Sequence, residues 1–170
     1  MNSIERREDI VKLLLDSLVP IKGTDIADKY NVTRQVIVKD IAILRAKGFN
    51  IMATPDGYIV NRSDGKIKTI IAVKHNEDKM FDEMSTVIKY GGIIEDVIVE
   101  HSLYGEIKGI LMVKSLNDLN KFIAKYSNQE GRLLSVLTNG VHLHTISAET
   151  SEDIDAIISE LKDKKFIVSD

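Results

Sequence analysis

The sequence predicts an α+β protein in which a helical N-terminal domain is followed by an α/β sandwich with a largely antiparallel sheet. Two observations lead to this fold class. Apolar residues recur at helical spacing through residues 3–47, and after residue 65 short β-branched runs alternate with amphipathic helical segments. A chain of 170 residues has room for two small domains. The polar, turn-rich stretch Asn61–Gly65 separates them, which gives domains over residues 1–62 and 66–170.

The N-terminal domain is organised around residues 24–48, which predict two helices joined by a tight turn. The first helix extends to about Tyr30, and Asn31 tolerates the left-handed conformation that ends it. Thr33 is placed to cap the second helix, and Gly48 is placed to terminate it. Two short helices in this arrangement are typical of a helix-turn-helix.

The second helix of this motif has two distinct faces. Ile37, Ile41 and Leu44 recur at helical spacing and form a core stripe, while the opposite face is polar near the N-terminus and slim further along. Such a helix fits a DNA major groove, where Arg34 and Gln35 are suited to reading guanine and adenine. An ordinary helical hairpin with solvated charges has the same pattern. If the motif binds DNA, the expected contacts are Thr33, Arg34, Gln35, Val38, Lys39 and Arg45.

Flanking segments complete a winged helix. Residues 3–17 predict an amphipathic helix, with Ser3 as its cap, and Thr24 is the expected cap of the next helix. Thr54–Gly57 contains Pro and Asp-Gly between two short apolar runs, which predicts a hairpin. This hairpin either contacts the DNA backbone as a wing or covers the helical core.

The second domain reads as strands alternating with helices, in the order β-α-β-β-α-β. Capping-box-like patterns begin two of its helices at Ser115 and Thr150. This order predicts helices packed on one face of a largely antiparallel sheet. Strands are expected over residues 66–74, 93–101, 107–113, 133–137 and 141–146, with an edge strand at 166–168, and helices over 76–90, 115–127 and 150–162.

Composition narrows the function classes. The net charge is −3, but residues 1–62 carry a net +2 and residues 63–170 a net −5, so the basic excess lies on the half that contains the helix-turn-helix. The absence of Cys excludes disulfides and thiolate metal ligands. The N-terminus lacks a signal-peptide core and no apolar run approaches the length of a membrane span, so we expect a cytoplasmic protein.

All four histidines fall in the second domain, and three of them suggest a metal site. His142 and His144 lie on one strand at i and i+2, so their imidazoles share a face. His75 lies at a strand-to-helix junction, and Glu83 is about two helical turns further on. These donors predict a site for a divalent cation such as Zn, Ni or Fe, with open positions for a ligand. A chance surface pair of histidines is the alternative.

Catalysis has weak support, because the chain contains no P-loop, dinucleotide-binding fingerprint or nucleophile elbow. His101 ends a strand and is interpreted as a structural or ligand-contact residue. Arg132, Lys108 and Lys114 are candidates for holding an anionic ligand by charge-assisted bonds, unless they are merely solvated.

These residues resemble a known family. TDIADKYNVTRQVIVKDIAILRAKGFNI resembles the winged helix-turn-helix at the start of biotin repressors, and the HNEDKMFDE and GVHLHTI segments resemble the three-histidine (3H) domain. Together, over nearly the whole chain, they resemble the bacterial niacin-responsive transcriptional repressors. The resemblance implies a dimeric, non-enzymatic repressor of NAD biosynthesis or niacin uptake genes. Nicotinic acid would be the co-repressor, with His101 and Arg132 as candidate effector contacts. His75, Glu83, His142 and His144 would be the metal ligands.

Two other functions fit the residues. One is a regulator that senses a metal or an amino acid, and the other is a metal-dependent hydrolase with a DNA-binding appendage, since a metal beside a carboxylate can activate water. A ligase of the biotin-repressor type is disfavoured, because the chain is short and lacks the glycine-arginine loop of that activity.

Overall fold

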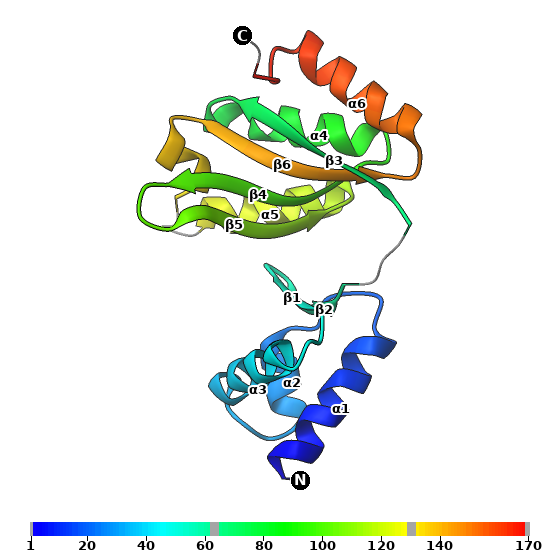
Figure 1. Ribbon diagram of the computed structural model, residues 1–170, viewed down its shortest axis with the longest axis vertical. Helices are drawn as coiled ribbons and strands as arrows, with labels where there is room; N and C mark the ends of the chain where they lie inside the picture. Colours follow the sequence, from blue (N-terminus) through cyan, green and yellow to red (C-terminus); the bar gives the residue numbers. More distant parts are fainter. Residues whose placement is uncertain (1, 62–64, 129–131, 169–170) are drawn as a thin grey trace. The chain divides into compact units, whose positions relative to one another are not determined.

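The computed structural model describes residues 2–61, 65–128 and 132–168, and the chain divides into two compact units, Met1–Ser63 and Asp64–Asp170 (Figure 1). The expected boundary stretch Asn61–Gly65 includes residues 62–64, which lie outside the described residues. Each unit has its own apolar core.

The first unit is a winged helix-turn-helix, as the sequence predicts. Eight buried apolar residues hold it together, among them Ile10 and Leu14 of the first helix and Ile37 and Ile41 of the third. Tyr58 of the hairpin packs against this core and pairs with Ile21, so the hairpin does cover the helices. Its elements are α1 (Ser3–Asp16), α2 (Gly23–Lys29), α3 (Arg34–Ala46), β1 (Ile51–Thr54) and β2 (Gly57–Val60).

The helix boundaries confirm some capping predictions and correct others. Asn31 and Gly48 adopt φ of +50° and +94° at the ends of α2 and α3, as expected. Asn2, rather than Ser3, caps α1, through a capping box with Glu5. Thr24 lies inside the first turn of α2 and donates its hydroxyl to Asp25 instead of accepting a backbone N–H. Thr33 is the N-cap residue of α3, but its side chain makes no cap hydrogen bond.

A buried carboxylate joins α1 to α3. Asp40 is 2% exposed and lies on the inner side of α3. Its oxygens accept from Arg6 Nε at 2.7 Å and from Arg7 Nη1 at 3.1 Å. Because a charge this deep in the protein is costly without partners, the two arginines fix the crossing of α1 over α3.

We predict that Asp40→Ala destabilises the first unit by about 3 kcal/mol, because it leaves two largely buried guanidinium groups without their counter-ion. The measurement is urea denaturation of the full chain followed by circular dichroism. Asp28→Ala is the matched control, because Asp28 is exposed on α2. Equal loss of stability in both variants would show that the buried pair does not hold the helices together.

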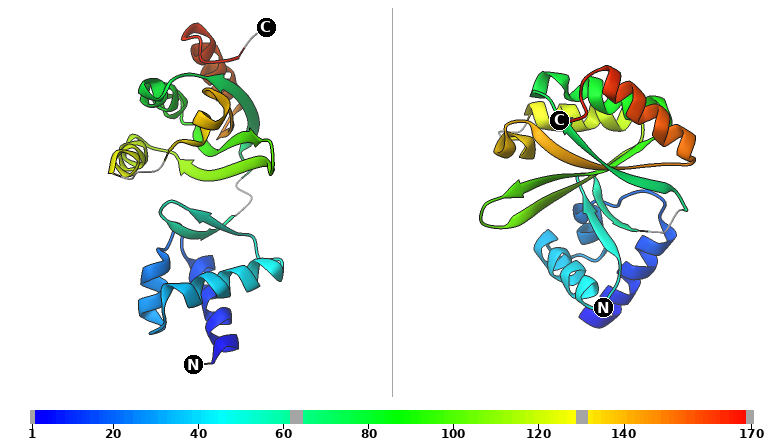
Figure 2. Two further views of the ribbon diagram at one scale, coloured as in Figure 1. Left: turned by 90° about the vertical axis from the view of Figure 1, so that its left-hand side faces the viewer. Right: turned by 45° about the horizontal axis from the view of Figure 1, so that its top comes forward.

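The second unit is a four-stranded antiparallel sheet with helices on one face (Figures 1 and 2). The strand order is β3-β6-β4-β5, so the last strand of the chain is inserted next to the first. The helices bury an apolar core against the sheet, which includes Met84, Ile94, Ile146 and Ile157. The elements are β3 (Ile67–Lys74), α4 (Met80–Lys89), β4 (Ile93–His101), β5 (Gly105–Val113), α5 (Leu116–Asn128), β6 (Val141–Ala148) and α6 (Ser151–Asp163).

Three expected elements differ from the structure. Residues 133–137 do not form a strand, because Leu134–Thr138 is a 3-10 helix, η2. The segment after β3 begins with a second 3-10 helix, η1 (Glu77–Lys79), before α4 starts. Residues 166–168 make a single bridge to β3, between Ile167 and Val73, rather than a full strand. Thr150 caps α6 as predicted, by accepting from the Asp153 N–H.

Candidate metal centre

Pairing of β3 with β6 brings the three expected histidines together. His142 on β6 lies opposite Val73 on β3, two residues before His75. His144 points to the same side of the sheet as His142 and is 3% exposed. Glu83 enters from the inner face of α4 and is fully buried. Four side chains, two from β6, one from the junction after β3 and one from α4, therefore converge under the helical layer.

The separations between their donor atoms suit a metal ion. His142 Nε2 lies 3.1 Å from His144 Nε2, and Glu83 Oε2 lies 3.4 Å from His75 Nε2 and 3.6 Å from His144 Nε2. Ligands bound to one ion at about 2.0–2.2 Å lie roughly 3–3.6 Å apart. Donor atoms of His75, Glu83 and His142 all lie within 4.8 Å of one another, and His144 joins that group through its contacts with Glu83 and His142.

Backbone carbonyls fix the orientation of all three imidazoles. The Nδ1 atom of His75 lies 2.8 Å from the Asn76 carbonyl, that of His142 lies 2.9 Å from the Gly140 carbonyl, and that of His144 lies 2.6 Å from the Asp96 carbonyl. A carbonyl only accepts, so each Nδ1 carries the proton and each neutral ring presents the Nε2 lone pair to the centre. This arrangement is typical of histidines that bind a metal through Nε2.

Buried atoms without a hydrogen-bond partner show whether the centre fits a divalent cation. Both carboxylate oxygens of Glu83 and Nε2 of His75 are buried and make no hydrogen bond with the described residues. If both rings are neutral, the Nε2 atoms of His142 and His144 turn their lone pairs toward each other across 3.1 Å. A divalent cation would satisfy these atoms together, and an all-nitrogen-and-oxygen donor set is suited to Zn, Ni or Fe. The residues present therefore fit the group that the sequence predicts.

The electrostatics follow from one carboxylate among three imidazoles. Burial opposes charge on His144 and His75, but the carboxylate of Glu83 outweighs it and raises the pKa of both rings. Burial raises the pKa of Glu83, yet the two imidazoles outweigh it and hold that pKa well below its usual range. Burial and the neighbouring His144 lower the pKa of His142 to about 4. The centre thus favours a positive charge beside Glu83, which a proton or a cation can supply.

The turn before β6 positions two of the ligands at once. Gly140 has φ +87°, and its carbonyl accepts from the imidazole of His142. A Cβ at this position would lie 2.6 Å from the backbone oxygen of His75. The close approach of these two backbones therefore requires glycine.

We predict that Gly140→Ala weakens metal binding and lowers stability by about 1–3 kcal/mol more than Gly91→Ala. Both glycines have positive φ, but a Cβ at Gly91 meets no atom within 4 Å, so the control carries the backbone strain without the clash. Metal titration and urea denaturation of both variants measure the difference. Identical behaviour would contradict a positioning role for Gly140.

A small cavity adjoins the four candidate ligands. Its volume is about 40 Å³, enough for an ion and a few water-sized ligands. Its far wall is apolar and comes from α4, α5, β4, β5 and the segment at η2, and Ser135 adds a hydroxyl. Sequence reasoning did not identify this wall, because its members are ordinary core residues. They are Met80, Met84, Val97, Leu111, Phe122, Leu133 and Leu134.

Asp96 supports the centre and was not predicted. It is 2% exposed at a bulge in β4, where its carbonyl accepts from His144 and its carboxylate accepts from the Thr145 N–H at 2.9 Å. Lys108 pairs with the same carboxylate at 2.7 Å. The sequence feature that could have pointed to Asp96 is its position as an acidic residue within the apolar run of β4.

The expected effector contacts lie away from this cavity. His101 is at the end of β4, where its Nδ1 accepts from the backbone N–H groups of Leu103 and Tyr104. Arg132 is exposed, and neither residue lines the cavity. Lys108 lies at 2.7 Å from the carboxylate of Asp96, and its contact with an anionic ligand stays a prediction.

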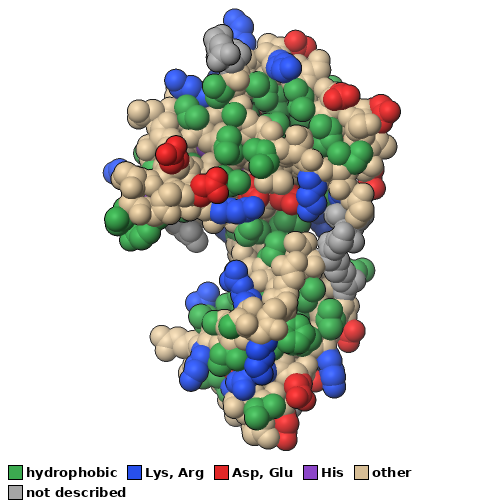
Figure 3. Space-filling model, viewed as in Figure 1, with side chains coloured by type: hydrophobic (Ala, Val, Ile, Leu, Met, Phe, Trp, Pro, Cys, Tyr) green, Lys and Arg blue, Asp and Glu red, His purple; other side chains and the backbone are tan. Residues whose placement is uncertain are grey.

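The six residues expected to contact DNA are all exposed, and all lie at the start or on the outer face of α3. Ile37, Ile41 and Leu44 are buried, so the helix divides into an inner and an outer face as predicted. Figure 3 shows Lys and Arg side chains around α3 on the surface of the first unit. The six residues are Thr33, Arg34, Gln35, Val38, Lys39 and Arg45.

Comparisons with known proteins match both units. Residues 68–170 match a family described as the 3H domain, and residues 6–59 match one described as an HTH domain. The probable transcription repressor NiaR of Thermotoga maritima is 42% identical over 166 residues, which cover 98% of this chain and 95% of that protein. The transcription repressor NadR of Bacillus subtilis is 33% identical over 169 residues, covering 97% and 94%.

A third relative matches less of its own length. An uncharacterized protein of Methanothermus fervidus is 29% identical over 135 residues, which cover 64% of this chain but 21% of that protein. Within the described part of the chain, every helix is too short or too polar to cross a membrane.

Proposed function

Because the chain belongs to the 3H-domain family of transcription repressors, we propose that it represses genes of NAD biosynthesis or niacin uptake in response to nicotinic acid and a divalent metal. The observation that carries the sensory part of this proposal is the buried cluster of three oriented imidazoles around a carboxylate that accepts no hydrogen bond from the described residues. The chemistry of this cluster suits ligand sensing. The two relatives that the chain matches over nearly its whole length are named repressors rather than enzymes.

DNA binding is assigned to α3. Its exposed N-terminal residues are expected to reach base edges in the major groove, as recognition helices do. Arg34 is suited to a bidentate contact with guanine, Gln35 to one with adenine, and Val38 to contact with a thymine methyl. Lys39 and Arg45 lie on the same outer face and are expected to contact bases or phosphates.

Metal binding is assigned to His75, Glu83, His142 and His144. When bound, a divalent cation would supply an open coordination position beside the apolar cavity. The chain's own part is to hold the three Nε2 atoms in place through backbone carbonyls, and to present the buried carboxylate of Glu83 from α4. The apolar environment strengthens those interactions by excluding water.

Nicotinic acid is assigned to the cavity next to these ligands. Its ring suits the apolar wall formed by residues such as Phe122 and Leu133, and its carboxylate suits the open coordination position that a bound cation would offer beside His75. The present volume of about 40 Å³ has no room for the ring, so this wall must open as the effector enters. Effector binding then stabilises the arrangement with the open wall over the one with the closed wall. The size of this effect is limited by the difference between the effector's affinities for the two arrangements.

A homodimer is the expected form, since helix-turn-helix repressors place two recognition helices on two half-sites. In the second unit the helices cover one face of the sheet, and the opposite face carries Ile70, which is 61% exposed (Figure 2). Ile70 belongs to the edge strand β3, and a second copy of the chain that met the sheet at this edge would cover its side chain. Sedimentation velocity of the full chain measures this directly.

DNA binding is tested by fluorescence anisotropy, with labelled DNA from upstream of the organism's NAD biosynthesis or niacin uptake genes. A scrambled duplex of equal length is the control, and the salt concentration is fixed because phosphate contacts make affinity salt-dependent. Affinity at least about a thousandfold higher for the upstream DNA supports a specific repressor. Equal affinities would overturn the proposed regulatory target.

A further inference from the structure

A second hollow lies next to the metal centre, on the outer side of His75. It is an open groove of about 490 Å³, within the range of small-molecule sites. Three segments that are distant in sequence enclose it: the junction after β3, the turn before β6 and the end of α6. Residue His75 borders both this groove and the small cavity. The lining of the groove includes the side chains of Lys74, Lys79, Asp82, Lys164, Lys165 and Phe166.

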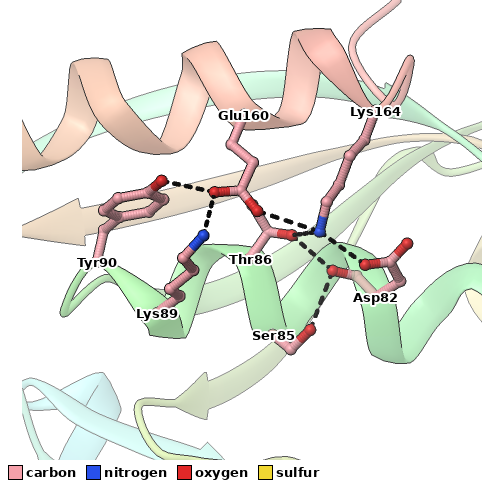
Figure 4. Close-up of polar contacts among 7 residues, drawn as sticks. All are labelled: Asp82, Ser85, Thr86, Lys89, Tyr90, Glu160 and Lys164. Atoms are coloured by element: carbon pink, nitrogen blue, oxygen red, sulfur yellow. Dashed lines mark hydrogen bonds and ion pairs between the residues drawn. The ribbon is translucent and has the colours of Figure 1, made fainter.

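Among the residues that the structure describes, four lysines and one acidic side chain, that of Asp82, line the groove. Lys164 is engaged, since its Nζ lies 2.8 Å from Asp82 Oδ1 and 3.2 Å from Glu160 Oε1 (Figure 4). Lys74, Lys79 and Lys165 have no ion-pair partner among the residues that the structure describes. Three lysines that lack an ion-pair partner among the described residues therefore line one hollow.

This charge is unusual for its surroundings. Residues 63–170 carry a net −5, so a concentration of lysines here opposes the charge of the whole unit. Cations at the end of α6 stabilise that helix end, which accounts for Lys164 and Lys165 but not for Lys74 and Lys79. Lys165 also adopts φ +61°, a conformation in which glycine or asparagine is easier to accommodate. A cationic side chain is thus placed at the groove despite a conformational cost.

We propose that this groove binds a nucleotide-sized organic phosphate, in addition to the metal and effector of the neighbouring centre. Several ammonium groups around one hollow suit a ligand with at least two negative charges, and lysine is a frequent phosphate ligand. The ring of Phe166, which packs edge-on against His75 with centroids 5.6 Å apart, forms an apolar floor for the organic part. Duplex DNA fits less well, because the acidic remainder of the unit repels it.

The test is isothermal titration of ADP into the full chain, freed of metal so that chelation by the nucleotide does not contribute. Saturable binding that weakens with added salt is expected, because the contacts are ionic. Lys79→Gln/Lys165→Gly should weaken it at least about tenfold. Glycine suits the positive φ at residue 165, so this variant keeps its fold. Lys121→Ala on the exposed side of α5 is the charge control and should bind as the unmodified chain does.

Other probes identify what is recognised. Adenosine should not bind, and inorganic phosphate should bind more weakly than ADP. Phosphate binding as tight as that of ADP would overturn the nucleotide part of the proposal. No heat with millimolar ADP, or equal binding by the double variant and the Lys121→Ala control, would overturn the site. Loss of duplex-DNA affinity in the double variant without any ADP binding would show instead that the lysines contact DNA. None of these outcomes depends on metal or nicotinic acid.

Discussion

His142→Ala/His144→Ala is expected to abolish divalent-metal binding, which is the largest effect that the structure predicts for any substitution in the second unit. The double variant removes two of the four convergent donors, and it leaves His75 and Glu83 without a chelating set. Four-ligand zinc sites bind with about 10–16 kcal/mol, so losing half of the donors should weaken affinity by at least about a thousandfold. Metal content of the purified protein and thermal melting with added metal measure this.

His101→Ala is the matched control, because it removes the fourth histidine at a site outside the cluster. Metal should raise the melting temperature of the unmodified chain and of this control but not that of the double variant, since a ligand stabilises only the state it binds. His144→Gln keeps most of the side-chain volume, so a loss of metal binding in this variant is not caused by a cavity left in the core. Unchanged metal content in the double variant would contradict the assigned ligands, and full nicotinic acid response without metal would contradict the effector site.

Arg34→Ala/Gln35→Ala is expected to remove most of the sequence-specific DNA affinity. Each bidentate contact with a base is worth about 1–3 kcal/mol, so the double variant should lose roughly 30-fold or more on its operator. Both side chains are exposed at the start of α3, and the fold should therefore be unaffected. Affinity for scrambled DNA should fall much less, because non-specific binding depends mainly on phosphate contacts.

Arg132→Ala provides the control for this variant, since it removes an exposed arginine from the second unit. Anisotropy titrations without nicotinic acid compare the two variants on operator and scrambled DNA. If the Arg34→Ala/Gln35→Ala protein binds its operator as tightly as the control does, α3 is not the recognition helix.

Local patterns in the sequence predicted most of the fold. The buried stripe of α3 and the left-handed Asn31 follow from spacing and residue type, and both were found. The prediction of a strand over residues 133–137 was wrong, because a short apolar run does not distinguish a strand from a buried turn of helix. The strand order could not be predicted from local patterns, because it depends on pairing between β3 and β6, which are about 70 residues apart.

Local patterns also predicted part of the candidate site. The two-residue period of a strand placed His142 and His144 side by side, and the structure has their Nε2 atoms 3.1 Å apart. The carbonyl of Gly140, the bulge at Asp96 and the buried carboxylate of Asp40 were not foreseen, because each depends on a tertiary contact. No local pattern indicates which charged residue will be buried with partners.

The most direct measurement of the central claim is anisotropy of labelled operator DNA with the full chain at fixed salt, with and without nicotinic acid and with and without a loaded divalent metal. The account predicts that nicotinic acid tightens binding when metal is present and has little effect when it is absent. Affinity that nicotinic acid leaves unchanged in both metal states would contradict the co-repressor assignment, and it would direct attention to metals or amino acids as the signal.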